Sequence, residues 1–194
     1  MSSMKHTPAE ALENVEAPGR ILTTNAARAL AVLRICTGVV FLWAFFDKAF
    51  GWGYATPGAR AWVNGGSPTK GFLSSVDVGP FQSMFHSMAG TWWADWSFML
   101  GLLAIGVAVT LGVGMRIAAG AGALMMAMMW LAEFPPAQHN AAGAPSMSTN
   151  PLLDYHFIYA VTLVVLAVTY AGYTWGLGRR WTTLPLVRHH HWLV

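Results

Sequence analysis

Five ionisable side chains lie where long apolar runs of the sequence begin or end. Asp47 and Lys48 end one run, Glu133 ends another, and Asp154 and His156 precede a third. Carboxylates and imidazoles exchange protons with bound ligands, and histidine does so near neutral pH. If the fold brings these ends together, the five side chains form a polar pocket beside apolar surface.

One further charge lies inside an apolar run. Arg34 is placed well within the run that begins near residue 26. A charge at membrane depth costs free energy and is a functional candidate for that reason. A guanidinium there can also snorkel to the membrane surface or make a structural pair inside the bundle. The sequence alone leaves these roles open.

Four apolar runs must position these side chains. They cover residues 26–46, 97–115, 117–134 and 157–177, and only 10% of the chain is charged, against about 25% in soluble domains. A helix needs about 20 apolar residues to cross a bilayer, and barrel strands would alternate polar and apolar residues. We therefore predict an all-α, integral membrane four-helix bundle over residues 26–178.

The basic residues orient this bundle. An even number of spans puts most of the 11 lysines and arginines on one side and leaves Lys48, Arg60 and Lys70 on the other. The positive-inside rule then predicts that both termini are cytoplasmic. The expected location is a bacterial plasma membrane. Residues 1–25 are expected to form a polar, disordered tail, and 179–194 a basic tail. The net charge of +3 follows from this topology and does not indicate nucleic-acid binding.

The long loop between the first two runs, residues 51–95, is predicted to be external. Four apolar residues in it recur at helical spacing, which predicts a short amphipathic helix on the outer surface: Phe81, Met84, Phe85 and Met88. Three tryptophans then precede the second run, where an aromatic belt is expected: Trp92, Trp93 and Trp96.

Some chemistry is excluded by composition. Cys36 is the only cysteine, so the chain alone cannot exchange electrons through a Cys pair or build a Cys-ligated cluster. No Gly-rich phosphate loop follows a strand. The methionines at 125, 126, 128 and 129 are typical of helix packing, and the three histidines at 189–191 lie in a tail.

Three interpretations of the polar end remain. A quinone headgroup could bind there, with apolar walls around its tail. The charges could instead pair with one another at the water interface. A divalent ion could bind to Glu133, His139, Asp154 and His156, but their spacing matches no metal motif, so we predict no metal.

Four segments of the sequence, taken in order, carry a resemblance to a known family: Leu33-Arg34-Ile35-Cys36-Thr37-Gly38-Val39-Val40-Phe41-Leu42-Trp43 with Phe46-Asp47-Lys48, Trp62 to Gly71, Leu111 to Arg116, and Asn150-Pro151-Leu152-Leu153-Asp154-Tyr155-His156 with Tyr159. On these segments the sequence resembles the DoxX family of four-span membrane proteins, in particular its DoxD-like branch. The resemblance covers about residues 28–178.

The resemblance implies a membrane subunit of a thiosulfate:quinone oxidoreductase, which oxidises thiosulfate to tetrathionate and reduces a membrane quinone. Carried onto this sequence, it implies that four residues act in catalysis: Asp47, Lys48, Asp154 and His156. Arg34, Glu133 and Tyr159 would contact the quinone. Lys48, with Arg60 or Lys70, would attract an anionic sulfur substrate. A second, DoxA-like redox subunit would complete the enzyme.

Two alternatives are non-catalytic. The protein could be a membrane anchor or scaffold that gathers soluble redox enzymes of an oxidative-stress complex. A small transporter is less consistent, because the spans show no broken helices or inverted repeat. Apart from lipid, the expected partners are therefore a redox subunit, a soluble redox enzyme or further copies of this chain, which Gly- and Ala-rich helix faces would admit.

Overall fold

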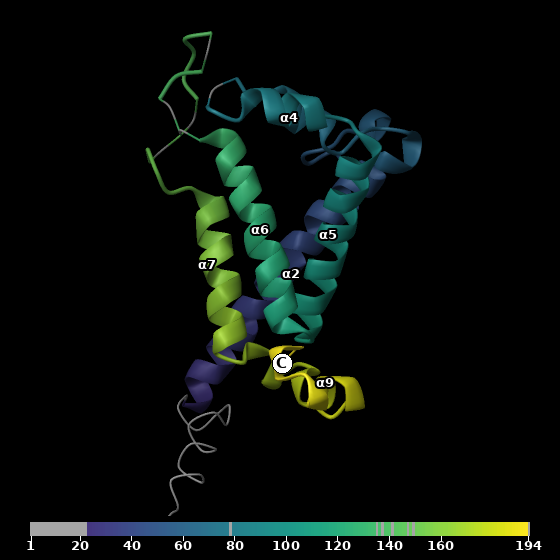
Figure 1. Ribbon diagram of the computed structural model, residues 1–194, viewed down its shortest axis with the longest axis vertical. Coiled ribbons are helices and arrows are strands. Elements are labelled where there is room, and N and C mark those ends of the chain that lie inside the picture. Colours follow the sequence, from purple (N-terminus) through teal and green to yellow (C-terminus); the bar gives the residue numbers. More distant parts are fainter. Residues whose placement is uncertain are drawn as a thin grey trace, which may run out of the picture.

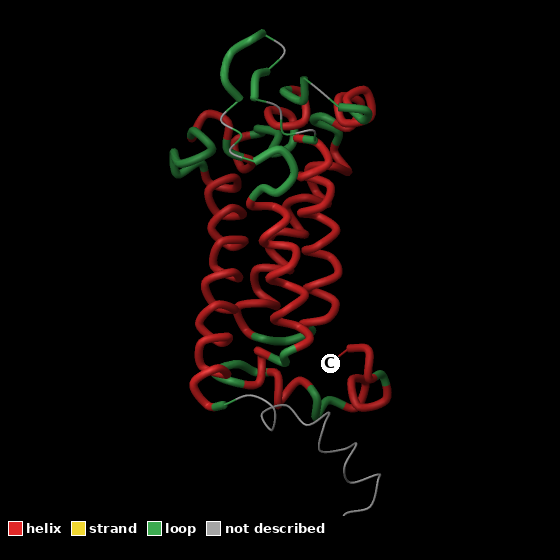
Figure 2. Tube along the Cα trace, turned by 90° about the vertical axis from the view of Figure 1, so that its left-hand side faces the viewer, coloured by secondary structure: helices red, strands yellow, loops and turns green. Residues whose placement is uncertain are grey.

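The computed structural model describes residues 23–193 apart from 78, 135, 137, 141, 147 and 149. Within these residues the protein is all-helical, with two isolated bridges and no named strand. Four helices run along the long axis of the molecule, as Figures 1 and 2 show: α2 (Thr24–Phe50), α5 (Trp92–Leu111), α6 (Met115–Glu133) and α7 (Tyr155–Val168). Most of the predicted tail at 1–25 lies outside the described residues.

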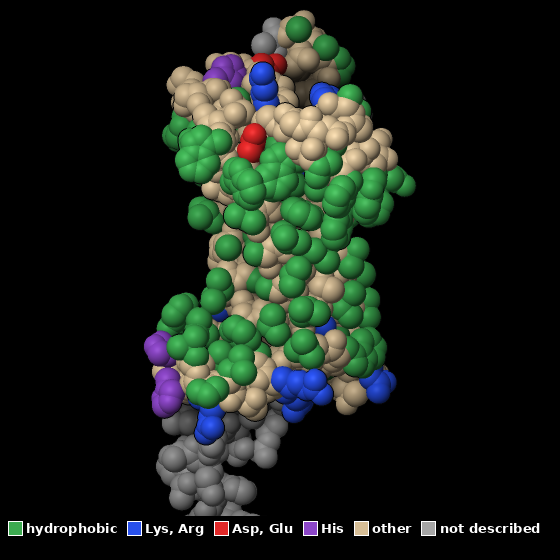
Figure 3. Space-filling view, turned by 90° about the vertical axis from the view of Figure 1, so that its right-hand side faces the viewer, with side chains coloured by type: hydrophobic (Ala, Val, Ile, Leu, Met, Phe, Trp, Pro, Cys, Tyr) green, Lys and Arg blue, Asp and Glu red, His purple; other side chains and the backbone are tan. Residues whose placement is uncertain are grey.

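Three of these helices are long and apolar enough to cross a membrane. They are α2 with 27 residues, α5 with 20 and α6 with 19. The fourth, α7, is equally apolar but has 14 residues, which extend about 21 Å against a hydrocarbon core of about 30 Å. Apolar side chains cover the middle of the surface in Figure 3, as expected where helices contact lipid.

The helix ends differ from the predicted spans for local backbone reasons. α2 begins two residues early, where the Thr23 hydroxyl accepts from the Ala26 amide (3.2 Å), and continues to Phe50 rather than 46. α5 covers Trp92–Leu111 rather than 97–115, since Gly112 and Gly114 both have a left-handed backbone (φ 73° and 55°). The predicted third span, 117–134, corresponds to Met115–Glu133.

The predicted fourth span, 157–177, differs most from the structure. α7 begins at Tyr155, where Asp154 caps its N-terminus, and ends at Val168. Tyr170 then adopts a left-handed backbone (φ 52°), and a short 3-10 helix follows at Ala171–Tyr173. The apolar run is therefore part helix and part a turn that folds back under the bundle.

The four long helices form a bundle that is closed at one end and open at the other. α2 packs mainly on α5, and α6 packs mainly on α7. α5 and α6 lie close together near α9 (Pro185–His189) and separate toward α4 (Gln82–Met88), as Figure 1 shows. These two ends are called the α9 end and the α4 end. The C-terminus and the beginning of α2 both lie at the α9 end.

The predicted amphipathic helix is α4, and its apolar face packs on protein. Phe85 is buried in a small cluster with Leu73, Val76 and Ala132, which joins α4 to α3 (Lys70–Ser74) and to the last turn of α6. The segment between α2 and α5 therefore forms a roof over the α4 end.

Charges are segregated between the two ends. The described carboxylates all belong to elements at the α4 end: Asp47, Asp77, Asp95, Glu133 and Asp154. The α9 end carries arginines instead: Arg28, Arg34, Arg116, Arg179, Arg180 and Arg188. Figure 3 shows the same separation on one face, with red atoms confined to the α4 end.

Candidate functional site

A buried histidine lies between two carboxylates at the α4 end. Asp154 caps α7, and one of its oxygens accepts from the Phe157 amide (3.1 Å). Its other oxygen lies 2.6 Å from Nδ1 of His156, and Glu133 Oε2 lies 3.8 Å from the same nitrogen. With Asp154 ionised, Nδ1 must carry the proton and donate it. The three groups can therefore share and pass protons.

Burial differs sharply across this triad. The His156 side chain is 1% exposed, whereas that of Glu133 is 39% exposed. The imidazole Nε2 is buried and has no hydrogen-bond partner among the described residues. Glu133 is thus the member of the triad that a ligand can reach, and His156 lies behind it.

The triad also has the composition of a metal site. Glu133, Asp154 and His156 each bring one potential ligand atom within 4.8 Å of the others. Two carboxylates and an imidazole suit several divalent ions. However, the 2.6 Å separation of His156 and Asp154 is that of a hydrogen bond, so an ion would have to displace that bond.

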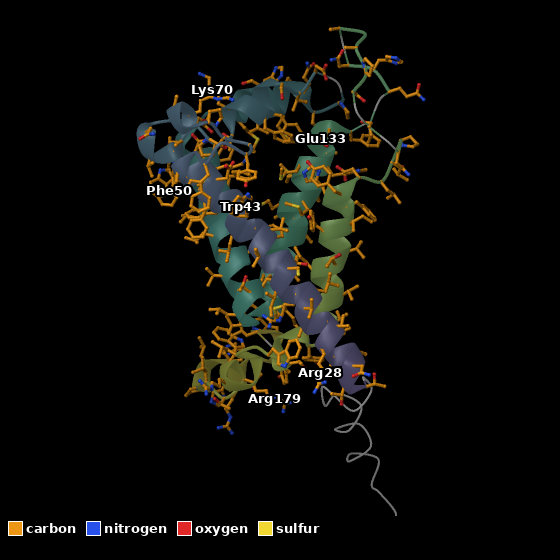
Figure 4. The ribbon with its side chains drawn as sticks, turned by 180° about the vertical axis from the view of Figure 1, so that it is seen from behind. Arg28, Trp43, Phe50, Lys70, Glu133 and Arg179 are labelled. Carbon is orange, nitrogen blue, oxygen red and sulfur yellow. The ribbon has the colours of Figure 1, made fainter. Side chains whose placement is uncertain are left out.

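A cavity of about 1230 Å³ lies between α5 and α6, under the roof. Its walls are mainly apolar and include Phe98, Ile105, Leu124, Met125 and Met128. Its polar lining includes three cations and one carboxylate: Lys48, Arg60, Lys70 and Glu133. Figure 4 shows Lys70 and Glu133 at this end, on opposite sides of the space between the helices. Such a cavity suits an amphipathic ligand.

Glu133 connects this cavity to the triad. It lines the cavity, together with the neighbouring Tyr155, whereas Asp154 and His156 do not. Tyr159, the tyrosine proposed for quinone contact, packs edge-on against Phe41 and Tyr155, with ring centroids 6.4 Å apart in both pairs. Of the residues predicted from the sequence, the cavity lining contains Lys48, Arg60, Lys70 and Glu133.

Asp47 stabilises the turn that follows α2. Its buried carboxylate accepts from the backbone amides of Tyr54 (3.1 Å) and Ala55 (2.9 Å). These bonds fold the chain back directly after α2. The carboxylate is thus held by backbone amides, while its neighbour Lys48 lines the cavity.

Arg34 lies at the opposite end of the bundle from Glu133. It is 0% exposed, so it does not snorkel to the surface. Its guanidinium donates to the carbonyls of Val109 (2.7 Å), Thr110 and Trp175 (3.0 Å). These carbonyls belong to the last turn of α5 and to the segment after α7. Arg34 thus ties three parts of the chain together, and the cavity lining does not include it.

Asp95 is a buried carboxylate that sequence reasoning did not single out. It lies in the first turn of α5 and accepts from Ser67 Oγ (2.9 Å), the Thr69 amide (3.0 Å) and Thr69 Oγ1 (2.6 Å). Ser67 and Thr69 both line the cavity. Asp95 therefore fixes part of the roof. A single carboxylate in an otherwise apolar helix is the feature of the sequence that could have identified it.

Comparison of the chain with protein-family models, with curated proteins and with solved structures gave no match.

Proposed function

We propose that this protein is a four-span membrane protein that binds a quinone in the cavity between α5 and α6. In this proposal it is the membrane subunit of a quinone-linked oxidoreductase of the DoxX/DoxD type. The observation that carries it is the position of Glu133, which lines an apolar cavity and lies 3.8 Å from the buried His156. A quinone needs apolar walls for its tail and a proton-exchanging group for its head.

The topology of the proposal uses α7 as the fourth crossing. Its helix spans about 21 Å, and the bilayer can thin or the flanking residues can complete the distance. By the positive-inside rule, the arginines at the α9 end support a topology in which that end, with both termini, faces the cytoplasm of a bacterial cell. The cavity and the triad lie toward the outer leaflet.

Bound quinone would supply an acceptor for two electrons and two protons. Glu133 gives protons to the ligand, and its carboxylate is then reprotonated through the His156–Asp154 pair behind it. The apolar walls contact the tail. The three cations of the lining, Lys48, Arg60 and Lys70, attract an anionic electron donor.

Thiosulfate is the proposed donor, on the strength of the sequence resemblance. Joining two thiosulfate ions through a new S–S bond releases two electrons, which balances the reduction of one quinone. With one cysteine, the chain cannot build a Cys-ligated cluster of its own. Electrons therefore reach the quinone directly from the donor or through a DoxA-like subunit.

The test is thiosulfate-dependent reduction of a short-chain quinone analogue by purified protein, with and without co-purified partners. Glu133→Gln keeps the shape of the side chain, so we expect binding to persist and reduction to fall by about 10²–10⁴-fold. Ala121→Trp places an indole ring in the cavity and should strongly weaken binding. Val164→Trp, at an exposed position of α7 outside the cavity lining, is the matched control.

A non-catalytic scaffold is the second candidate. An exposed aromatic patch on α2 and the following turn favours it, because such patches mark interaction surfaces: Trp43, Phe50, Trp52 and Tyr54. Figure 4 shows Trp43 and Phe50 on the outer side of the bundle. A protein that binds no quinone analogue, in wild-type form and with partners restored, would favour the scaffold over the enzyme.

A further inference from the structure

The cavity between α5 and α6 extends from the core of the bundle to its outer surface. On α5 its lining passes from the buried Ala94 and Ile105 to the exposed Ser97. On α6 it includes Leu124, which is 66% exposed. A cavity whose wall contains exposed side chains of two neighbouring helices opens between those helices. The gap bounded by these exposed side chains is called the lateral opening: Trp93, Ser97, Ala121 and Leu124.

The lateral opening lies at the depth of the hydrocarbon core. Leu124 is the tenth of the 19 residues of α6, one of the helices that can cross a membrane. It lies nine residues before Glu133, which is about 14 Å along the helix. Half of a hydrocarbon core is about 15 Å, so the opening reaches close to the middle of the bilayer. Figure 1 shows that the gap between α5 and α6 widens from there toward the α4 end.

The side chains of the lateral opening are uncharged. The charged residues of the cavity lining belong instead to the ends of α2 and α6 and to the roof: Lys48, Arg60, Lys70 and Glu133. An ion would lose its hydration in passing between the exposed side chains of α5 and α6, whereas an apolar chain loses nothing there. The lateral opening therefore suits the apolar part of a ligand.

The roof and the lateral opening differ in how they are closed. Part of the roof is fixed, because Asp95 accepts hydrogen bonds from Ser67 and Thr69, which line the cavity. The gap between α5 and α6 is crossed by a flexible side chain, since the methyl group of Met125 lies where a Cβ on Gly101 would be. A methionine side chain changes its conformation readily. This side of the cavity can therefore admit a ligand without a change in the backbone.

We propose that the cavity takes its ligand from the bilayer through the lateral opening, and that the ligand's tail stays in the opening while its head lies near Glu133. The inference rests on the proposed function, in which this ligand is a quinone. It restricts the ligand class to molecules dissolved in the bilayer, with a compact polar head and an apolar tail longer than about 14 Å. The anionic electron donor approaches from the roof, where the cations lie.

The test uses the full chain in lipid nanodiscs that contain a phospholipid with a diazirine near the end of one acyl chain. After illumination, the labelled residues are mapped by peptide mass spectrometry, with and without a decyl-tailed quinone analogue. We expect labels on the exposed Leu124 and, behind it, on Met125 and Met128, because acyl chains enter the lateral opening. The quinone analogue should reduce the labels on the two methionines and leave those on Val161, an exposed position of α7 outside the cavity lining.

A pair of glycine variants provides the matched control. Gly101→Leu narrows the lateral opening, because the new side chain occupies the space that Met125 crosses, and we expect the label on Met128 to be lost. Gly120→Leu makes the same change at an exposed position of α6 outside the cavity lining, where a Cβ would meet nothing within 4 Å, and should leave the labels unchanged. Thermal unfolding checks that both variants fold. Ser97→Leu narrows the same opening and replaces Gly101→Leu if that variant does not fold.

The outcomes separate this inference from the proposed function. Wild-type protein without acyl-chain labels on Met125 and Met128 would overturn the lateral opening. Labels there that neither Gly101→Leu nor Ser97→Leu reduces would also overturn it. Labels that both variants reduce but the quinone analogue does not would support the lateral opening and contradict quinone as the ligand.

Discussion

The two ends of this bundle use buried charge in opposite ways. At the α9 end, Arg34 is fully buried and its hydrogen bonds to described residues all go to backbone carbonyls, so the charged side chain holds this end of the bundle together. At the α4 end, the buried His156 pairs with Asp154 and lies near the accessible Glu133, beside a cavity of about 1230 Å³. The role of a buried ionisable residue therefore follows from its partners. Arg34, which bonds to backbone carbonyls, has a structural role. His156, which has carboxylate partners beside a cavity, lies at the end of the bundle that can exchange protons with a ligand.

Glycines reinforce this difference. At the α9 end, a Cβ on Gly112 would lie 2.6 Å from the Cα of Gly172, so two backbones meet without side chains between them. The amide of Leu177 also donates to the carbonyl of Leu111 (2.8 Å). α5 and α6 separate toward the α4 end, and at Gly120, an exposed position of α6 outside the cavity lining, a Cβ would meet nothing within 4 Å.

Removing Arg34 should give the largest loss of stability. In Arg34→Met the carbonyls of Val109, Thr110 and Trp175 lose their donor inside the bundle, so we expect the free energy of unfolding to fall by about 3 kcal/mol or more. Arg28→Gln, at an exposed position of the same helix, should change it by less than about 0.5 kcal/mol. Thermal unfolding in detergent measures both changes. Equal losses of stability in the two variants would contradict the claim that buried Arg34 holds the α9 end together.

Gly172→Ala tests the close backbone contact at the α9 end. The new methyl group would overlap the backbone of Gly112, and we expect a loss of about 1–3 kcal/mol. Gly120→Ala is the matched change in open space within α6, where alanine favours the helix by up to about 1 kcal/mol. The same unfolding assay should thus give opposite signs; destabilisation by both changes would contradict this account.

Asp95→Asn should act locally at the α4 end. Loss of charge weakens the bonds from Ser67 and Thr69, and we expect a loss of about 1–2 kcal/mol. Hydrogen exchange of the amides at 67–70 should become faster, while amides in the last turn of α5 stay protected. Ser67→Ala removes one of the three bonds and should have a smaller effect. Unchanged exchange at 67–70 would show that Asp95 does not hold the roof.

The smallest effect is expected from metal removal. If Glu133, Asp154 and His156 share protons, treatment with a chelator should leave the unfolding temperature and quinone binding unchanged. Inductively coupled plasma mass spectrometry of the purified protein provides the control measurement. A stoichiometric divalent ion whose removal lowers the unfolding temperature would assign the triad to metal binding.

The sequence predicted the helical architecture better than the roles of single residues. Apolar runs at 26–46, 97–115 and 117–134 correspond to long helices, and helical spacing at 81–88 located α4, because periodicity and length are local properties. The end of α7 at Val168 was not predictable in this way. The apolar run continues to 177, and the turn depends on Gly172 meeting Gly112 from another part of the chain.

Site residues show the same limit. The order of the runs predicted that Glu133, Asp154 and His156 would share one end, and the structure brings them into contact. The sequence could not show that Asp47 accepts hydrogen bonds from backbone amides or that Arg34 donates to backbone carbonyls. Backbone partners leave no signal in the sequence. Asp95 was missed because its partners, Ser67 and Thr69, lie in a loop far from it in the sequence.

The most direct test of the central claim is photo-crosslinking with a quinone that carries an azido group, followed by peptide mapping. The account predicts labels on the cavity walls at Leu124, Met125 and Met128, which are lost in Ala121→Trp and retained in Val164→Trp. Labels at the α9 end near Arg34, or labelling that Ala121→Trp leaves unchanged, would contradict it.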